Sequence, residues 1–241
     1  MMPFKLSGHT RPYAVLGHPI GHTLSPVMHN ASFRKLGLDA IYLAFDVAPD
    51  KLLKVLPVMA DMGFGGVNLT VPLKELAFKG LKDLDESARV LGSVNTIQFV
   101  PRGFRGHSTD GRGFLIALDE AFSITPRGAS VFVLGSGGAG RAVAITCARA
   151  GARQIALTDM DLTRAARVAR EIKAVAPKAR TTVVEFNSAQ WKKACAAASL
   201  VVQATPVGMK PGENSLLGPE AFRKGQYVYD LVYMYPQTPF M

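Results

Sequence analysis

The stretch that decides the fold is Ser130-Val-Phe-Val-Leu-Gly-Ser-Gly-Gly-Ala-Gly140. Its run Val131–Leu134 is apolar without alternation, which predicts a parallel strand covered on both faces. The pattern Gly-x-Gly-x-x-Gly follows at once, and an Ala-rich segment to about residue 150 then predicts a helix. The first glycine permits a tight turn, the second lets the main chain approach a pyrophosphate, and the third lets the helix pack on the strand. The stretch therefore predicts a dinucleotide-binding fold, and a glycine-rich turn without a ligand is the alternative. The candidate cofactor-binding residues here are Gly135, Ser136, Gly137, Gly138, Ala139 and Gly140.

A carboxylate stands where such a fold would hold the ribose of its cofactor. Asp159 follows the next predicted strand and lies about 20 residues after Gly140. A carboxylate there accepts hydrogen bonds from a ribose 2′-hydroxyl and repels a 2′-phosphate, so it favours NAD over NADP. The nearby Arg164 reduces that repulsion and is a further cofactor-binding candidate. The alternative role of Asp159 is to cap the next helix, for which Asp161 competes.

Composition sets the broad class of the chain. Its 241 residues are 48% hydrophobic and 19% charged, which is typical of a globular protein of one large or two modest domains. The two cysteines, Cys147 and Cys195, form no CxxC pattern, which excludes a disulfide framework and suits a reducing cytoplasm. No run of about 18 apolar residues predicts a membrane span. The histidines have no metal-ligand spacing, so we expect no metal site.

The net charge of +10 raises the question of a nucleic-acid partner. The excess of Lys and Arg is spread over both halves of the chain, without a basic tail or a basic stripe interleaved with aromatic residues. We therefore expect no nucleic-acid binding. A small ligand that bears phosphate or carboxylate groups explains the charge as well, and so does solubility alone.

Hydrophobic patterning predicts two α/β domains. In the first half we expect strands over 13–17, 41–47 and 66–71, helices over 26–36 and 50–62, and a hairpin formed by 95–100 and 105–107. Residues 110–122 predict a connecting helix, in which Gly111 and Gly113 are potential hinges. In the second half we expect strands over 130–134, 154–158, 181–186, 200–204 and 227–232, with helices over 138–150 and 162–176. This order predicts a substrate-binding domain over 1–111 with a mixed or mostly parallel sheet, then a doubly wound dinucleotide-binding Rossmann domain over 112–241.

Polar side chains in the first half mark a candidate substrate site. Asn68 and Thr70 alternate with apolar neighbours on a predicted strand, so they point to one face. Lys74 follows shortly after, and a lysine near a carboxylate such as Asp110 can pass a proton while a hydride moves. Taken singly, Lys74 beside Glu75 is better explained as a solvated helix residue and Asp110 as a helix cap.

Together these residues resemble a known family, the shikimate dehydrogenases. The motifs that match, in order, are His22-Thr-Leu-Ser-Pro26, Asn68-Leu-Thr-Val-Pro-Leu-Lys74, Gly92-Ser-Val-Asn-Thr96, Ser108-Thr-Asp-Gly111, the glycine loop, Ala204-Thr-Pro-Val-Gly208 and Tyr229-Asp-Leu-Val-Tyr233. The resemblance covers nearly the whole chain. It implies a cytoplasmic enzyme, a monomer or homodimer, that reversibly reduces 3-dehydroshikimate to shikimate with NADP or NAD in aromatic amino-acid biosynthesis.

The resemblance also implies roles for individual residues. The residues that would hold the hydroxyls and carboxylate of shikimate are Thr23, Ser25, Asn68, Thr70, Asn95, Asp110 and Tyr233. Lys74 would be the acid and base, paired with Asp110. The residues that would line the cofactor, besides the glycine loop, are Thr205 and Leu231.

Three departures from the family pattern leave alternatives open. Thr23 replaces the usual serine and adds a methyl group to the pocket. The stretch Asp159-Met-Asp161 replaces the Asn-Arg-Thr of members that use NADP and is closer to members that use NAD. We also expect the C-terminal closing segment of the family to be absent after Met241. A quinate dehydrogenase that uses NAD, or a non-catalytic sensor of the same ligands, are the alternatives.

Overall fold

The computed structural model describes residues 6–241 and divides the chain into two compact units. The first unit ends at Thr109 and the second begins at Asp110. The boundary expected from the sequence, after residue 111, falls in the first turn of α5 (Asp110–Phe122). Among the described residues, no helix combines the length and the apolar character that crossing a membrane requires.

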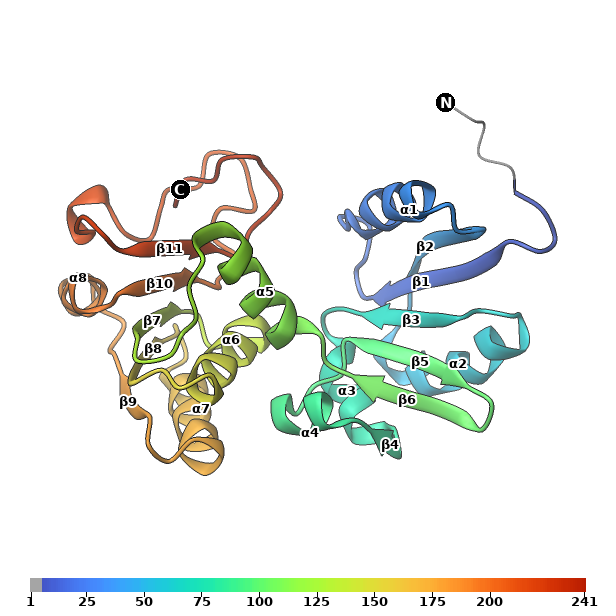
Figure 1. The fold of residues 1–241 in the computed structure, drawn as a ribbon, viewed down its shortest axis with the longest axis horizontal. Helices are drawn as coiled ribbons and strands as arrows, with labels where there is room; N and C mark the ends of the chain where they lie inside the picture. Colours follow the sequence, from blue (N-terminus) through green and yellow to red (C-terminus); the bar gives the residue numbers. More distant parts are fainter. Residues whose placement is uncertain (1–5) are drawn as a thin grey trace. The chain divides into compact units, whose positions relative to one another are not determined.

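The first unit is built on a six-stranded mixed sheet (Figure 1). Its strands are β1 (Arg11–Gly17), β2 (Ala40–Asp46), β3 (Gly66–Leu69), β4 (Asp83–Leu84), β5 (Thr96–Val100) and β6 (Gly103–His107), in the order β2-β1-β3-β5-β6-β4. Strand β1 pairs in parallel with β2 and β3, whereas β5 is antiparallel to both β3 and β6. The helices are α1 (Ser25–Leu36), α2 (Leu52–Asp61), α3 (Leu73–Gly80) and α4 (Glu86–Leu91), with a 3-10 turn η1 (Pro49–Lys51).

Alternation along β1 explains how both faces of this sheet are covered. Leu16 points into a core that includes Leu52 of α2 and Leu73 of α3. The neighbouring Val15 points to the other face, where it packs with Tyr42 and with Phe33 of α1. Helices thus cover the two faces at β1, and the carboxyl ends of β1 and β3 lead directly into the segments that carry the candidate substrate residues.

The second unit has a five-stranded, fully parallel sheet. Its strands are β7 (Ser130–Leu134), β8 (Gln154–Thr158), β9 (Arg180–Val183), β10 (Leu200–Gln203) and β11 (Tyr227–Asp230), in the order β11-β10-β7-β8-β9. The first strand, β7, lies in the middle, and the chain winds outward from it in both directions, which is the doubly wound arrangement. Besides α5, the helices are α6 (Gly138–Arg149), α7 (Leu162–Val175) and α8 (Ser188–Ala197), with a 3-10 turn η2 (Pro219–Ala221).

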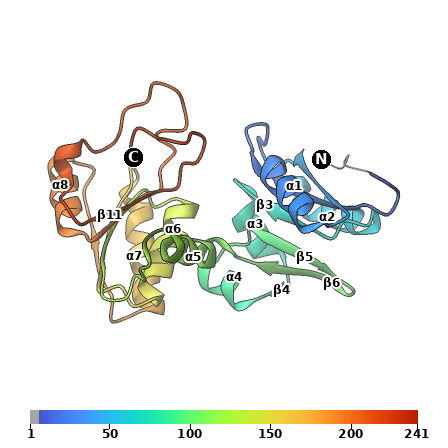
Figure 2. The ribbon, with the colours of Figure 1, turned by 45° about the horizontal axis from the view of Figure 1, so that its top comes forward.

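Both faces of β7 are buried, as its unbroken apolar run predicts. Phe132 and Leu134 pack with Trp191 and Cys195 of α8. Val133, on the opposite face, is also fully buried. Figure 2 shows α8 on one side of this sheet and the pair α6 and α7 on the other. The predicted Rossmann architecture of this unit is therefore confirmed.

The differences from the expected elements concern short segments. The helices and strands that are absent from the expected elements are β4, α4, α3 and α8. The first two are too short to establish a hydrophobic period, and only Trp191 and Cys195 of α8 are buried.

Candidate active site

The glycine loop between β7 and α6 meets the geometric demands of its motif. Gly135 has a φ of +94°, in the region that favours glycine. A Cβ at Gly140 would overlap the carbonyl oxygen of Gly135, so the third glycine is required by the packing of the helix against the turn. A Cβ at Gly137 would meet nothing. Since the fold does not need Gly137, its missing side chain leaves the main chain open to a ligand at the start of α6, where no side chain caps the helix.

Asp159 is bound to this loop rather than to a helix end. Its Oδ2 accepts a hydrogen bond from the N–H of Ser136 at 2.7 Å, and its Oδ1 accepts one from the N–H of Asp161 at 3.0 Å. The N-cap of α7 is Asp161, which accepts from the N–H of Thr163 at 3.0 Å. The guanidinium Nε of Arg164 lies 3.5 Å from Oδ2 of Asp161. The structure thus assigns the capping role to Asp161 and holds the Asp159 carboxylate beside the glycine loop.

A residue that the sequence analysis missed arranges the segment carrying Thr205. Gln203 ends β10 and is only 1% exposed. Its Nε2 donates to the carbonyl oxygens of Thr205 and Val207, at 3.2 and 2.8 Å, and its Oε1 accepts from the N–H of Thr205 at 2.6 Å. The main-chain carbonyl oxygen of Gln203 accepts a hydrogen bond from the N–H of Leu231 at 2.9 Å. A glutamine at the end of an apolar run was the signal available in the sequence.

Asp230 holds the segment that carries Tyr233. Its Oδ1 accepts from the N–H of Val232 at 2.9 Å, and its Oδ2 accepts from the hydroxyl of Thr238 at 2.6 Å. The two bonds close a loop over residues 231–237. Tyr233 lies in this loop with 68% of its surface exposed. The loop positions Tyr233 on the same strand end as Leu231, within the second unit.

In the first unit, the two candidate hydroxyls of the His22–Pro26 motif are bonded to each other. The Thr23 hydroxyl donates to Ser25 Oγ at 3.1 Å and accepts from the N–H of Ser25 at 3.2 Å. Ser25 is the first residue of α1. Close to the carboxyl ends of β1 and β2, His18 Nδ1 lies 2.6 Å from Oδ1 of Asp46. The hydroxyls of Thr23 and Ser25 are therefore held by hydrogen bonds between these two residues at the start of α1.

Two candidate amides from different strands are brought together. Asn68 Nδ2 donates to Thr96 Oγ1 at 2.9 Å and to the carbonyl oxygen of Asn95 at 3.3 Å. Asn95 in turn binds Thr109 through both its side-chain atoms, since Nδ2 donates to the hydroxyl and Oδ1 accepts from the N–H, each at 2.9 Å. Tyr42, which the sequence analysis did not single out, donates its hydroxyl to Asn68 Oδ1 at 2.6 Å. No pattern in the sequence indicated that contact.

Thr70 and Lys74 lie at the end of β3 and the start of α3. The N–H of Thr70 donates to the carbonyl oxygen of Leu16, at 2.9 Å, and a Cβ on Gly17 would touch the Thr70 methyl group at 2.5 Å. Lys74 is the second residue of α3 and is half-buried. Asp110, the predicted partner of Lys74, is the half-buried first residue of α5.

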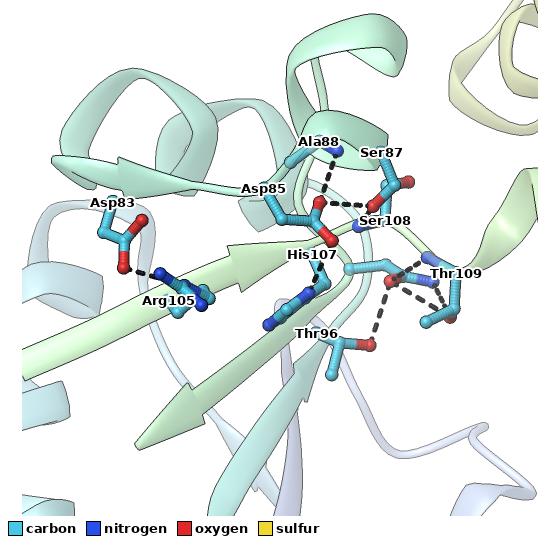
Figure 3. A network of polar contacts seen from close by, with 10 residues as sticks. Asp83, Asp85, Ser87, Ala88, Thr96, Arg105, His107, Ser108 and Thr109 are labelled. Atoms are coloured by element: carbon cyan, nitrogen blue, oxygen red, sulfur yellow. Dashed lines mark hydrogen bonds and ion pairs between the residues drawn. The ribbon is translucent and has the colours of Figure 1, made fainter. Parts of the chain in front are cut away.

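A second polar network lies at the end of β6 (Figure 3). His107 Nδ1 lies 2.7 Å from Asp85 Oδ2, and Asp85 Oδ1 accepts from the Ser87 hydroxyl at 2.5 Å and from the N–H of Ala88 at 3.0 Å. Burial on its own would raise the pKa of Asp85, but the hydrogen bonds and the charge of His107 outweigh it and lower that pKa. The Ser108 hydroxyl oxygen is buried. Within residues 6–241, it is the single buried side-chain nitrogen or oxygen atom without a hydrogen-bond partner.

Comparison with known proteins gives a consistent result. The family model described as the shikimate dehydrogenase substrate binding domain matches residues 15–97. A protein named shikimate dehydrogenase (NADP(+)) from Methanopyrus kandleri is 40% identical over 236 residues, which cover 97% of this chain and 81% of that protein. The shikimate 5-dehydrogenase of Listeria monocytogenes, solved in complex with shikimate and NAD, is 33% identical with a TM-score of 0.87, over 97% of this chain and 82% of that chain. The quinate dehydrogenase of Corynebacterium glutamicum, solved in complex with NAD, is 28% identical with a TM-score of 0.85, over 96% and 83% of the two chains.

Proposed function

The chain belongs to the shikimate dehydrogenase family, and from that premise we propose that it catalyses the reversible, NAD(P)-dependent reduction of 3-dehydroshikimate to shikimate. The observation that carries the proposal is the extent of the match to the Methanopyrus kandleri protein, which covers 97% of this chain and so spans both units. The reaction would serve aromatic amino-acid biosynthesis.

The residues of the second unit fit a dinucleotide. Gly137 leaves open space at the start of α6, where N–H groups without a side-chain cap suit a pyrophosphate. The Asp159 carboxylate lies beside this loop and keeps lone pairs for ribose hydroxyls beyond the two main-chain bonds that it accepts. The bound nicotinamide would supply or accept the hydride. Gln203 holds Thr205 at the end of β10, next to β7, and this position supports the proposal that Thr205 would line the same cofactor.

The residues of the first unit suit a polyhydroxylated carboxylic acid. Thr23 and Ser25 present paired hydroxyls near the start of a helix, a setting that favours the carboxylate of the substrate. Asn68 and Asn95 present amides for the ring hydroxyls. A site built to bind hydroxyl groups discriminates strongly against analogues that lack them, because its own polar groups are then left unpaired.

Proton transfer is assigned to Lys74. In the direction of reduction, the Lys74 ammonium gives a proton to the oxygen on which negative charge develops as the ketone becomes an alcohol. In oxidation, the neutral amine takes that proton from the substrate hydroxyl. Asp110 would keep Lys74 oriented and favour its charged form between the two steps.

For the cofactor we propose a preference for NAD. The Asp159 carboxylate is fixed next to the glycine loop, and its charge would oppose the 2′-phosphate of NADP. Arg164 lies with Asp161 instead of Asp159, so its charge is engaged elsewhere. The relatives are named for NADP(+), and their names therefore do not support a preference for NAD. The proposed preference depends on the carboxylate of Asp159 alone.

Quinate dehydrogenation is the second candidate. The likeness to the NAD complex of the Corynebacterium glutamicum quinate dehydrogenase favours it, as does the threonine at position 23, whose methyl group changes the shape of the carboxylate site.

Steady-state assays test both candidates. We expect kcat/KM for shikimate with NAD to exceed the values for quinate and for NADP. A higher kcat/KM for quinate would replace the first function by the second. A protein that binds shikimate without oxidising it with either cofactor would be a sensor, and the enzymatic proposal would fail.

A further inference from the structure

A row of side-chain hydrogen bonds crosses the first unit from Tyr42 to Thr109. The Tyr42 hydroxyl donates to Asn68 Oδ1 at 2.6 Å, and Asn68 Nδ2 donates to Thr96 Oγ1 at 2.9 Å. The Thr96 hydroxyl donates to Asn95 Oδ1 at 2.9 Å. The N–H of Thr109 donates to the same Asn95 oxygen at 2.9 Å. Figure 3 shows Thr96 and Thr109 at the end of this row. Four segments distant in sequence are therefore joined through side chains.

Two main-chain groups fix the direction of these bonds. The carbonyl oxygen of Asn95 can only accept, so Asn68 must turn Nδ2 toward it and Oδ1 toward Tyr42. The N–H of Thr109 can only donate, so Asn95 must turn Oδ1 toward it. Thr96 lies between the two amides, where it accepts from Asn68 and donates to Asn95. Reversing either amide would place two donors or two acceptors face to face.

The fixed direction decides what Asn68 can offer to a ligand. Both hydrogens of its Nδ2 are engaged, one by Thr96 and one by the Asn95 carbonyl oxygen. Its Oδ1 accepts from Tyr42 and keeps a second lone pair. Asn68 is therefore set as an acceptor, and it suits a ligand that brings a hydroxyl hydrogen.

Tyr42 is itself firmly held. It is 3% exposed, and its ring stacks on His29 with centroids 4.2 Å apart. The side chain of Asn30 donates to the Tyr42 carbonyl oxygen at 2.8 Å and accepts from its N–H at 2.9 Å. Burial raises the pKa of Tyr42, so its hydroxyl keeps the proton that it donates. A tyrosine that is this buried, and whose hydrogen is already donated to Asn68, can influence a ligand through Asn68.

We propose that Tyr42 is a positioning residue for substrate recognition, which sets Asn68 as an acceptor for a ring hydroxyl of the substrate and, through Thr96, steadies Asn95. This inference rests on the proposed function, since it takes the substrate to be a polyhydroxylated acid. It assigns a role to a buried residue whose hydroxyl already donates to Asn68.

The first experiment reads the row of bonds without any substrate. In ¹⁵N-labelled protein, Tyr42→Phe should shift the side-chain amide resonances of Asn68 and also those of Asn95, which Tyr42 does not touch. The matched control is Tyr13→Phe, because Tyr13 pairs with Tyr42 across β1 and β2 but lies outside the row. Asn95 resonances that stay in place in Tyr42→Phe would overturn the proposed coupling, whatever the activity of the protein.

The second experiment reads the consequence for the substrate. Tyr42→Phe should raise KM for shikimate roughly 3- to 10-fold, the size expected for one hydrogen bond, with kcat changed less than about twofold and KM for NAD unchanged. Thr96→Val removes the hydroxyl between the two amides and should also raise KM for shikimate. Thr96→Ser keeps that hydroxyl and should keep the wild-type KM. A deoxy analogue that lacks the hydroxyl facing Asn68 should bind wild type and Tyr42→Phe equally.

The outcomes separate this inference from the proposed function. If wild type oxidises shikimate and Tyr42→Phe has the same KM, the positioning role is overturned and the function stands. A fall in kcat at unchanged KM would also overturn it. If wild type does not oxidise shikimate, the function fails, and shifted Asn95 resonances would still support the row of bonds that defines the role of Tyr42.

Discussion

The N–H of Ser136 donates to Oδ2 of Asp159 over 2.7 Å, and this bond ties the glycine loop to the end of β8. One oxygen of the carboxylate thus braces the loop while the second braces the turn at Asp161. The same side chain that would meet the cofactor ribose is therefore a part of the loop that would meet the pyrophosphate. In the proposed role of Asp159, cofactor choice would therefore be coupled to the geometry of this loop.

Replacing Asp159 tests its role in cofactor choice. In Asp159→Ala the repulsion of a 2′-phosphate disappears, so the ratio of kcat/KM for NAD to that for NADP should fall roughly 10-fold, which corresponds to about 1.4 kcal/mol. Asp119→Ala is the control, since it removes an exposed carboxylate of α5 that is placed in no site and leaves the Ser136 bond in place. An equal ratio in wild type and Asp159→Ala would remove Asp159 from cofactor selection.

The glycines of the loop should separate into two kinds. Gly140→Ala forces a Cβ against the carbonyl oxygen of Gly135, so we expect it to lower the free energy of unfolding by about 1–3 kcal/mol. Gly137→Ala meets open space and should leave stability unchanged while it weakens NAD binding. Denaturant melts and titration calorimetry measure the two effects. A stable Gly140→Ala variant, or a Gly137→Ala variant with full affinity, would contradict this division.

The sequence predicted what local spacing encodes. The glycine loop, the position of Asp159 and the buried strand β7 follow from short-range patterns, and the structure has each of them where the pattern predicts. Tyr42 and Gln203 were not predicted. Each acts by a side-chain bond whose partner depends on the fold, and a tyrosine or glutamine beside apolar residues looks the same with or without that bond. The elements that escaped prediction, such as β4, are too short to show a period.

Lys74 should separate catalysis from binding. Lys74→Ala removes the proposed acid and base, so kcat should fall roughly 10²- to 10⁴-fold with a smaller change in KM. Lys79→Ala is the matched control, because Lys79 lies on the same helix, is exposed and is placed in no site. An unchanged kcat with a raised KM would make Lys74 a binding residue.

Both cysteines should be unreactive in the folded protein. Cys147 and Cys195 are fully buried, and burial raises their pKa values to about 12 and about 11. Because the thiolate is the reacting form, modification by a thiol reagent at pH 8 should be slow in the native protein and rapid for both residues after unfolding. A fast stoichiometric phase in the native protein would show that one of these thiols is accessible.

Asp85 should couple stability to acidic pH. Its pKa is lowered in the folded protein by hydrogen bonds from Ser87, Ala88 and His107, against the opposing effect of burial. A carboxyl whose folded pKa lies below its unfolded pKa contributes stability that is fully present above the unfolded value and is lost as the pH falls through the folded value. We therefore expect wild type to lose stability below about pH 4, and Asp85→Asn to lose less over the same range, because it has no charge to lose.

The control for this acid dependence is Asp83→Asn. Asp83 pairs with Arg105 at 2.8 Å, but both side chains are about half exposed, and such surface pairs contribute about 0–1 kcal/mol. Asparagine also serves as an N-cap, so Asp85→Asn keeps the start of α4 and changes mainly the charge facing His107. The free energy of unfolding, measured from pH 3 to 7, should therefore depend less on pH in Asp85→Asn than in wild type. In Asp83→Asn its dependence on pH should equal that of wild type. Equal slopes in all three proteins would mean that the network around Asp85 does not govern the acid response.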